Sequence, residues 1–125
     1  MVTGFIDSNI IVDVLRKHAP AEAWLSQQSN LGLTRFVWIE VLYGAINRVE
    51  QQRCIRLLRD FEIIEIQNAD VEWATQQSLA LSLRYNIDPI DYLIAAPAHR
   101  LQLPLYTRNL KHFGPLLGGL AVLAY

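Results

Sequence analysis

Short apolar runs alternate with helix-like segments along this chain, and this alternation constrains the fold more than any other feature. Because strands separated by helices are usually joined as parallel neighbours by right-handed crossovers, we predict an α/β fold. The expected architecture is a three-layer α/β/α sandwich around a central, mainly parallel sheet of four to five strands. The strand-like runs are 2–6, 30–36 with a break at Gly32, 62–66, 103–107 and 118–125.

The helical segments carry start signals. The clearest is at Asp88, which is placed as the N-cap, with Pro89 as the first helical residue and Asp91 as the third. The other expected helices are 8–18 capped by Ser8 or Asn9, 20–29 opened by Pro20, 38–49, 50–61 and 68–85, with a short turn or helix over 108–113.

Length and charge limit what the chain can be. Its 125 residues fit one domain, 1–125, and a net charge of −1 gives no overall attraction to nucleic acid or membrane. The charges are uneven, however, because all 12 carboxylates lie at or before Asp91, whereas Arg100, Arg108 and Lys111 follow it. The C-terminal part of the chain is therefore a small basic sector.

The single cysteine, Cys54, excludes an internal disulfide and a cysteine zinc cluster, and we expect it to pack in the interior. No apolar stretch reaches the length of a membrane span, and the N-terminus lacks the basic region and cleavage site of a signal peptide. We therefore expect a cytoplasmic protein with no membrane partner.

Three carboxylates occupy comparable places in successive units of the predicted fold. Asp7 follows the first strand, Glu40 lies early in the helix after the second strand, and Asp91 lies in the helix turn opened at Asp88. Since ligands of open parallel sheets gather at the carboxyl ends of strands, we expect these acids to converge there. Converging like charges need a compensating cation, and oxygen ligands without a nearby cysteine or HExxH pattern suit Mg²⁺ or Mn²⁺ rather than zinc.

Each acid also has a simpler interpretation. Asp7 could cap the helix that follows it, Asp91 could pair with the dipole of its own helix, and Glu40 could be a solvated surface residue. The joint placement of the three, rather than any one of them, favours a metal site.

Four segments carry a family resemblance in order and with suitable spacing: "FIDSNIIVDVLR", "LTRFVWIEVLYGA", "IDPIDYLIAAPAHRLQLPLYTRN" and "NLKHF". Over nearly its full length the sequence resembles a PIN domain, and more narrowly the VapC-type ribonuclease toxins of type II toxin–antitoxin systems. The resemblance implies a PIN-like sandwich and an endoribonuclease that hydrolyses RNA with Mg²⁺ (or Mn²⁺) held by the catalytic residues Asp7, Glu40 and Asp91. It also implies a cognate antitoxin as partner and a homodimer.

The chain departs from the family pattern at several positions. The family commonly has a fourth acid in its closing motif, where this chain has Asn109, and often another acid where it has His112. Asn109 could coordinate a metal ion through its amide oxygen or orient a bound water, but it brings no negative charge. The missing charge would affect the binding of a second metal ion more than the activity itself. Ser8 replaces the usual threonine and keeps a hydroxyl that could brace the site. Val37 and Pro97 also stand at common threonine positions, and Pro97 is placed to kink its helix.

Other polar and aromatic residues have expected places. Candidates for phosphate contacts, with solvated surface charge as the alternative, are Arg108 and Lys111 beside the site and Arg35 on the second strand. We expect Asp88 to act mainly as a cap. The histidines, which lack the mutual spacing of a metal centre and are expected at the surface or at helix ends, are His18, His99 and His112. The tryptophans expected in the core or in an interface are Trp24, Trp38 and Trp73.

Three other functions fit parts of the pattern. A catalytically silent PIN-like module that binds RNA or a protein would explain the missing fourth acid. A haloacid dehalogenase phosphatase also has an aspartate after its first strand, but it needs a second one two residues later, where this chain has Asn9. A phosphoacceptor receiver domain would need an acidic pair on a strand before the phosphorylated aspartate.

Overall fold

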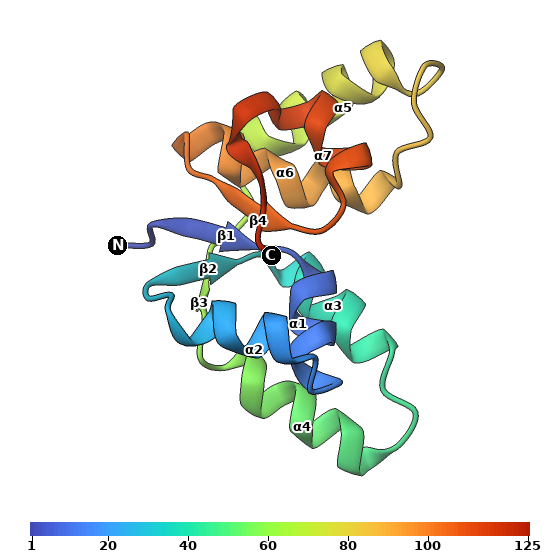
Figure 1. Ribbon diagram of the computed structural model, residues 1–125. Coiled ribbons are helices and arrows are strands. Elements are labelled where there is room, and N and C mark those ends of the chain that lie inside the picture. The colour runs from blue at the N-terminus through green and yellow to red at the C-terminus, as the bar shows by residue number, and fades with distance from the viewer.

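A five-stranded, entirely parallel sheet forms the centre of the protein, described by a computed structural model of residues 1–125 (Figure 1). The predicted α/β fold with its parallel sheet is therefore confirmed. The order across the sheet is β3-β2-β1-β4-β5. The strands are β1 (Gly4–Ile6), β2 (Leu31–Leu33), β3 (Glu62–Ile63), β4 (Leu105–Thr107) and β5 (Ala121–Leu123).

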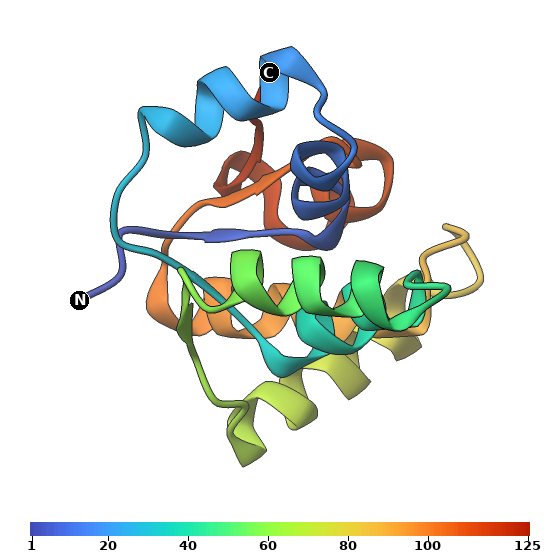
Figure 2. The same ribbon diagram turned by 90° about the horizontal axis from the view of Figure 1, so that it is seen from below.

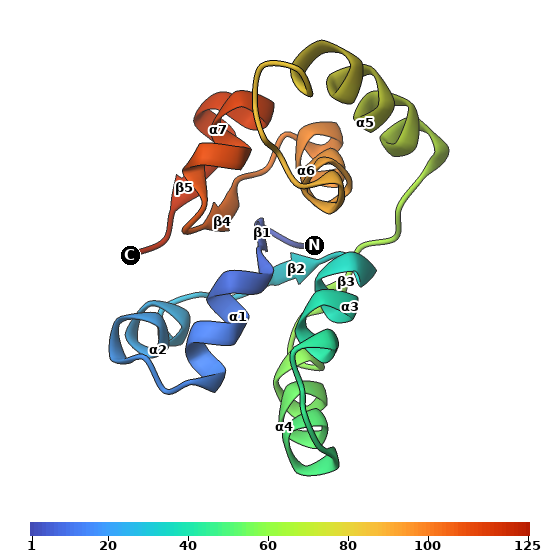
Figure 3. The same cartoon turned by 90° about the vertical axis from the view of Figure 1, so that its right-hand side faces the viewer.

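Seven helices cover the two faces of this sheet in three layers, as Figures 1 and 3 show. Helices α1 to α4 lie on one side and α5 to α7 on the other. The helices are α1 (Ser8–Leu15), α2 (Ala19–Ser26), α3 (Arg35–Tyr43), α4 (Arg48–Leu58), α5 (Asn68–Leu81), α6 (Pro89–Leu101) and α7 (Leu110–Leu117), followed by a 3₁₀ turn at Gly118–Leu120. No helix is both long and apolar enough to cross a membrane.

The chain reverses its direction of travel across the sheet between β1 and β4. From β1 it proceeds through β2 to β3 by way of α1 to α4, then returns through α5 and α6 to β4 on the other side of β1. A crevice at the carboxyl ends of the strands is expected at such a switch point, and this is where open α/β sheets bind ligands. Figure 2 shows the same arrangement of strands and helices seen from below.

The core holds both helix layers against the strands. Phe5, Ile6, Leu33 and Leu105 point from the strands into one cluster of 21 buried residues, which Cys54 also joins as expected. The three tryptophans pack against this cluster, as predicted. Burial of apolar area of this kind, at roughly 25 cal/mol per Å², is the main favourable term in folding.

Several predicted boundaries were wrong. Asp7, not Ser8 or Asn9, caps α1, because its side chain accepts the Ser8 amide at 2.7 Å. The second strand ends at Leu33, and α3 begins at Arg35 because Thr34 caps it, so Arg35 lies on a helix rather than on a strand.

Gly32 lies inside β2 and does not break it. A Cβ atom at this position would come within 2.9 Å of Val2 Cγ1 and 3.1 Å of Ile64 Cγ1, so the glycine allows the neighbouring segments to approach closely.

Three further elements differ in length from the prediction. The third strand covers only Glu62–Ile63, and α5 ends at Leu81 rather than near position 85. The short turn or helix expected at 108–113 is the eight-residue helix α7. Pro97 lies inside α6, as predicted, and the kink expected there stays a prediction.

Candidate active site

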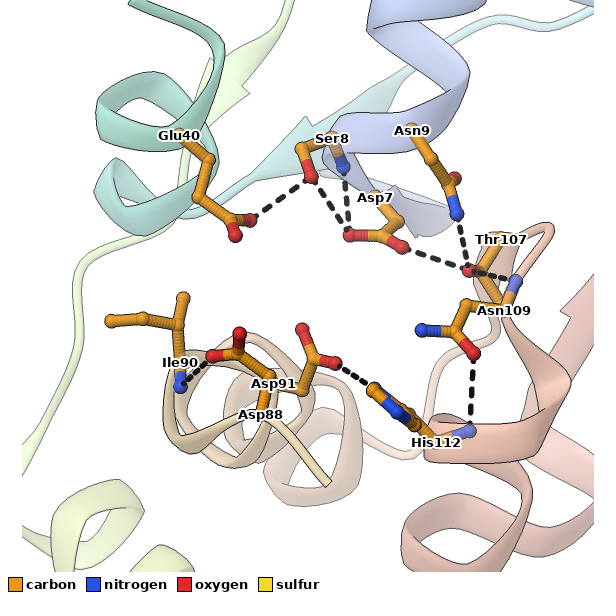
Figure 4. Close-up of polar contacts among 10 residues, drawn as sticks. All are labelled: Asp7, Ser8, Asn9, Glu40, Asp88, Ile90, Asp91, Thr107, Asn109 and His112. Carbon is orange, nitrogen blue, oxygen red and sulfur yellow. Dashed lines mark hydrogen bonds and ion pairs between the residues drawn. The ribbon is translucent and has the colours of Figure 1, made fainter. Parts of the chain in front are cut away.

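Asp7 lies where β1 ends and α1 begins, with only 4% of its surface exposed. Its Oδ1 accepts the backbone amide of Ser8 at 2.7 Å, and its Oδ2 accepts the Thr107 hydroxyl at 2.8 Å. Both carboxylate oxygens are therefore fixed by neutral donors, as Figure 4 shows. Asp7 is both the cap of α1 and the centre of a polar cluster, so its two interpretations are compatible.

Thr107 was not identified from the sequence, although it is fully buried at the end of β4. Its hydroxyl oxygen also accepts the Asn109 amide at 2.9 Å and lies 3.5 Å from Asn9 Nδ2. The pairing of Ile6 with Tyr106 places the following residues, Asp7 and Thr107, side by side. The sequence does show a polar residue at the end of the fourth strand. Recognising Thr107 as a neighbour of Asp7, however, requires knowing that this strand lies next to β1 in the sheet.

Glu40 reaches the same cluster from α3. The Ser8 hydroxyl donates to Glu40 Oε1 at 2.9 Å, and its oxygen also lies 3.5 Å from Asp7 Oδ1. Ser8 thus connects the acid on β1 with the acid on α3, which is the bracing position expected for this hydroxyl.

Asp91 enters from α6, on the opposite side of the cluster. Asp88 caps this helix by accepting the Ile90 amide at 3.0 Å, which leaves Asp91 in the first turn with 7% of its surface exposed. His112 Nδ1 lies 2.7 Å from Asp91 Oδ2. His112 lies in the first turn of α7, at a helix end as expected, but its ring also contacts Asp91, a contact that was not predicted.

Asn109 caps α7, since its Oδ1 accepts the His112 amide at 3.2 Å. Figure 4 shows that Asp7, Glu40, Asp91 and Asn109 surround a common space. The capping bond uses the amide oxygen of Asn109, so the group that faces this space is its NH₂, which donates hydrogen bonds and is not a metal ligand.

The three acids raise one another's pKa. Burial raises the pKa of Asp7 to about 6, against the lowering effect of the Thr107 hydrogen bond, and the charge of Asp91 raises it further. Burial also raises the pKa of Glu40, and the negative charge of Asp7 adds to this effect. Burial raises the pKa of Asp91 in the same way, and the negative charge of Glu40 adds to it. Such mutual repulsion in a low-dielectric space is what a bound cation would relieve.

The donor set fits a hard divalent cation by its chemistry. Carboxylate oxygens are the groups that Mg²⁺ and Mn²⁺ prefer, and no thiol lies in the cluster. No group of three or more His, Cys, Asp or Glu side chains is arranged to hold a metal ion as it stands. The acids therefore surround a space rather than form a closed set of ligands.

The three candidate phosphate-binding cations differ in their surroundings. Arg35 pairs with Glu65 at 2.7 Å, with both side chains exposed. Arg108 pairs with Asp13 at 2.6 Å, and its guanidinium lies 5.6 Å from the centre of the Tyr125 ring. Lys111 is exposed in the first turn of α7, two residues after Asn109 and directly before His112 in sequence.

Solved structures with the same fold cover nearly the whole chain. A chain of a toxin–antitoxin complex from Klebsiella pneumoniae has 28% identity and a TM-score of 0.77, with 98% of both chains covered. A chain of VapBC2 from Rickettsia felis, bound to a DNA fragment from its promoter, has 23% identity and a TM-score of 0.75, with 90% of this chain and 91% of that chain covered. FitAcB from Neisseria gonorrhoeae has 22% identity and a TM-score of 0.74, with 92% of both chains covered.

A search of curated protein sequences gives no match. The PIN domain family, in contrast, matches residues 4–113, a segment that contains every acid of the cluster and the Thr107, Asn109 and His112 side chains around it. Since this segment is most of the 125 residues, the chain belongs to the PIN domain family.

Proposed function

We propose that this protein is a metal-dependent endoribonuclease and the toxin of a type II toxin–antitoxin pair. The observation that carries the proposal is the convergence of three carboxylates, Asp7, Glu40 and Asp91, at the β1/β4 switch point, where burial and mutual charge raise the pKa of each. Membership of the PIN domain family supports nuclease chemistry at this cluster.

Asp7 and Asp91 would hold the ion from opposite sides of the space, and Glu40 would bind it directly or through water. When bound, Mg²⁺ or Mn²⁺ lowers the pKa of a water molecule and neutralises charge that develops on the phosphate. Thr107, Ser8 and His112 hold the carboxylates in place by the hydrogen bonds described above. The NH₂ of Asn109 is placed to donate to a water or to a phosphate oxygen.

RNA cleavage by the purified protein tests this proposal. Total RNA is incubated with wild type and with Asp7→Ala, in Mg²⁺, in Mn²⁺ and in EDTA. We expect cleavage by wild type only with metal, and none by Asp7→Ala, which is checked for native folding by circular dichroism. Cleavage in EDTA, or equal cleavage by Asp7→Ala, would contradict the metal site.

A silent module that binds RNA or protein is the second candidate. Two observations favour it: Asn109 brings no charge, and the acids do not form a closed set of ligands. Folded wild type that binds RNA in a filter assay yet leaves it intact with either metal would establish this alternative.

One neighbouring structure, that from Klebsiella pneumoniae, is a toxin–antitoxin complex, which supports an antitoxin partner for this chain as well. We propose that an apolar antitoxin segment binds the cleft of about 350 Å³ between α1, α3 and α4, which is lined partly by Val12, Leu15 and Val41. Arg16 and Arg53 line the same cleft and would pair with acids of that segment. Nearby apolar side chains that are exposed are Ile39, Tyr43, Ile46 and Val49, with 63%, 92%, 84% and 71% of their surface accessible.

Co-expression with the reading frame adjacent to the gene tests this partner. We expect a complex that copurifies with wild type and with the control Leu101→Asp, which changes an exposed side chain away from the cleft. Ile46→Asp and Val49→Asp should lose it. A complex unaffected by both substitutions would contradict the proposed surface.

The homodimer also remains a prediction. Light scattering of the purified protein should then give twice the 14.3 kDa mass of the chain.

A further inference from the structure

His112 makes the one hydrogen bond that holds the Asp91 carboxylate. Its Nδ1 lies 2.7 Å from Asp91 Oδ2, and the two side chains are 24% and 10% exposed. The other two acids are held by hydroxyl and amide donors: Asp7 by Ser8 N and Thr107 Oγ1, and Glu40 by Ser8 Oγ. Asp91 has no such donor on its own helix, and the imidazole takes that place.

The position of this imidazole is fixed by the helix that carries it. The Asn109 side chain caps α7 by accepting the His112 amide at 3.2 Å, and Asn109 N in turn donates to Thr107 Oγ1 at 2.9 Å. A chain of hydrogen bonds therefore runs from Asp7 through Thr107 and Asn109 to the residue that contacts Asp91. Side-chain orientation on one side of the cluster is thus linked to orientation on the other.

We propose that His112 is a positioning residue that holds Asp91 for a divalent cation, an inference that rests on the proposed function. An ionised Asp91 only accepts hydrogen bonds, so the imidazole must donate through Nδ1–H, which occupies Oδ2 and leaves Oδ1 for the common space seen in Figure 4. A histidine does this without adding a fourth negative charge to the three already there.

Metal affinity distinguishes positioning from simple packing between α6 and α7. His112→Leu keeps an apolar side chain of similar size but has no donor, whereas His112→Asn keeps an N–H close to the position of Nδ1. Loss of a partner that orients a metal ligand typically lowers metal affinity by about 10- to 100-fold. Calorimetric titration with Mn²⁺, and the melting temperature of each variant in EDTA, are the readouts.

We expect His112→Leu to bind Mn²⁺ about 10-fold or more weakly than wild type, and His112→Asn to stay within about 3-fold of it. In EDTA, the melting temperature of His112→Asn should stay close to that of wild type, whereas that of His112→Leu should be lower because the Asp91 carboxylate loses its donor, so affinities are compared at a temperature where all three proteins are folded. Equal Mn²⁺ affinity of His112→Leu and wild type would overturn the inference and leave the proposed function intact. Wild type that binds no Mn²⁺ would overturn both.

A measurement on wild type alone makes the test independent of how the variants fold. In ¹⁵N-detected imidazole spectra at pH 8, we expect the proton of His112 on Nδ1, and a shift of this signal when Mg²⁺ is added. A proton on Nε2 alone, with Nδ1 bare, would show that His112 does not donate to Asp91 and would overturn the inference.

Discussion

The Thr107 hydroxyl donates a 2.8 Å hydrogen bond to Asp7 Oδ2 across a separation of 100 residues in sequence. The bond exists because β1 and β4 are neighbours in the sheet, with Ile6 opposite Tyr106. Asp7 and Thr107 therefore both leave the carboxyl ends of their strands at the same point, and the hydroxyl offsets part of the cost of burying the Asp7 charge.

Replacing this hydroxyl should weaken the site. Thr107→Val has the same shape but no donor, so the pKa of Asp7 should rise above its value of about 6 and metal affinity should fall by about 10-fold or more. Thr107→Ser keeps the hydroxyl and is the matched control. Mn²⁺ titration and RNA cleavage rates check both variants, and equal behaviour of the valine and serine variants would refute this role for Thr107.

The raised pKa of Asp7 predicts how stability depends on pH in the absence of metal. The folded protein binds this proton with a pKa of about 6, against an ordinary aspartate pKa of 3.8, so the folded state holds more protons between these two pH values. The contribution of Asp7 to the free energy of unfolding therefore falls as pH rises from about 4 to about 6, by up to about 3 kcal/mol, and stays constant above that range.

Asp7→Asn isolates most of this effect, because the shifts of groups on which Asp7 does not act, such as the lowered pKa of Asp13, occur in both proteins and cancel. The part of the raised pKa of Glu40 that comes from the charge of Asp7 is lost together with that charge. In EDTA, Asp7→Asn should be about 1–2 kcal/mol more stable than wild type at pH 8, because it buries no charge but also lacks the charge-assisted hydrogen bonds. Near pH 4 wild type should be the more stable of the two by about 1 kcal/mol, because its own stability rises by about 2–3 kcal/mol as Asp7 becomes protonated. Urea unfolding at several pH values measures it. Mn²⁺ should then stabilise wild type but not Asp7→Asn. A difference between the two that does not change with pH would contradict the burial effect.

Lys111 should contribute more to RNA binding than Arg35. Arg35 already pairs with Glu65. Lys111 is exposed and precedes His112, the residue that contacts Asp91, in the first turn of α7. In EDTA, Lys111→Gln should weaken binding of single-stranded RNA several-fold and reduce the slope of log K against log salt by about 0.7, while Arg35→Gln should change both less. Filter binding at several salt concentrations provides the values. A larger effect of Arg35→Gln would place the RNA elsewhere on the surface.

Two ion pairs of different burial should differ in their effect on folding. Arg100 pairs at 2.9 Å with Asp70, which is 1% exposed and also accepts the Gln67 amide, whereas Arg35 and Glu65 are both exposed. Arg100→Leu would leave a buried carboxylate unpaired and should cost about 2–4 kcal/mol, whereas Arg35→Leu should cost less than about 1 kcal/mol. Denaturant unfolding compares the two. Similar losses would mean that Asp70 finds another partner or becomes protonated.

Local patterns were sufficient to predict the fold class and the acids of the candidate site. Alternating strands and helices gave the parallel sheet, and the Asp88-Pro89 start correctly placed Asp91 in the first turn of α6. Asp7 could be placed because a strand-to-helix transition is readable from a few adjacent residues.

The supporting residues required information that no single segment holds. Thr107 contacts Asp7 only because β4 lies next to β1 in the sheet. The sequence of a three-residue strand does not indicate which strand it pairs with. His112 contacts Asp91 because the first turn of α7 packs against α6, and the spacing of residues along the sequence does not reveal this packing. Ile39 and Tyr43 have helical spacing on α3 but are exposed, since periodicity alone does not tell a buried helix face from an exposed one.

The central claim is that Asp7, Glu40 and Asp91 act together through one bound cation on RNA. The most direct test measures the rate of cleavage of one labelled RNA as a function of Mn²⁺ concentration, for wild type and for the Asp7→Asn, Glu40→Gln and Asp91→Asn variants. We predict that wild type reaches half its maximal rate near the Kd measured by calorimetry, and that each variant loses at least 100-fold. Cleavage that persists in EDTA, or that survives in any of the three variants, would contradict the account.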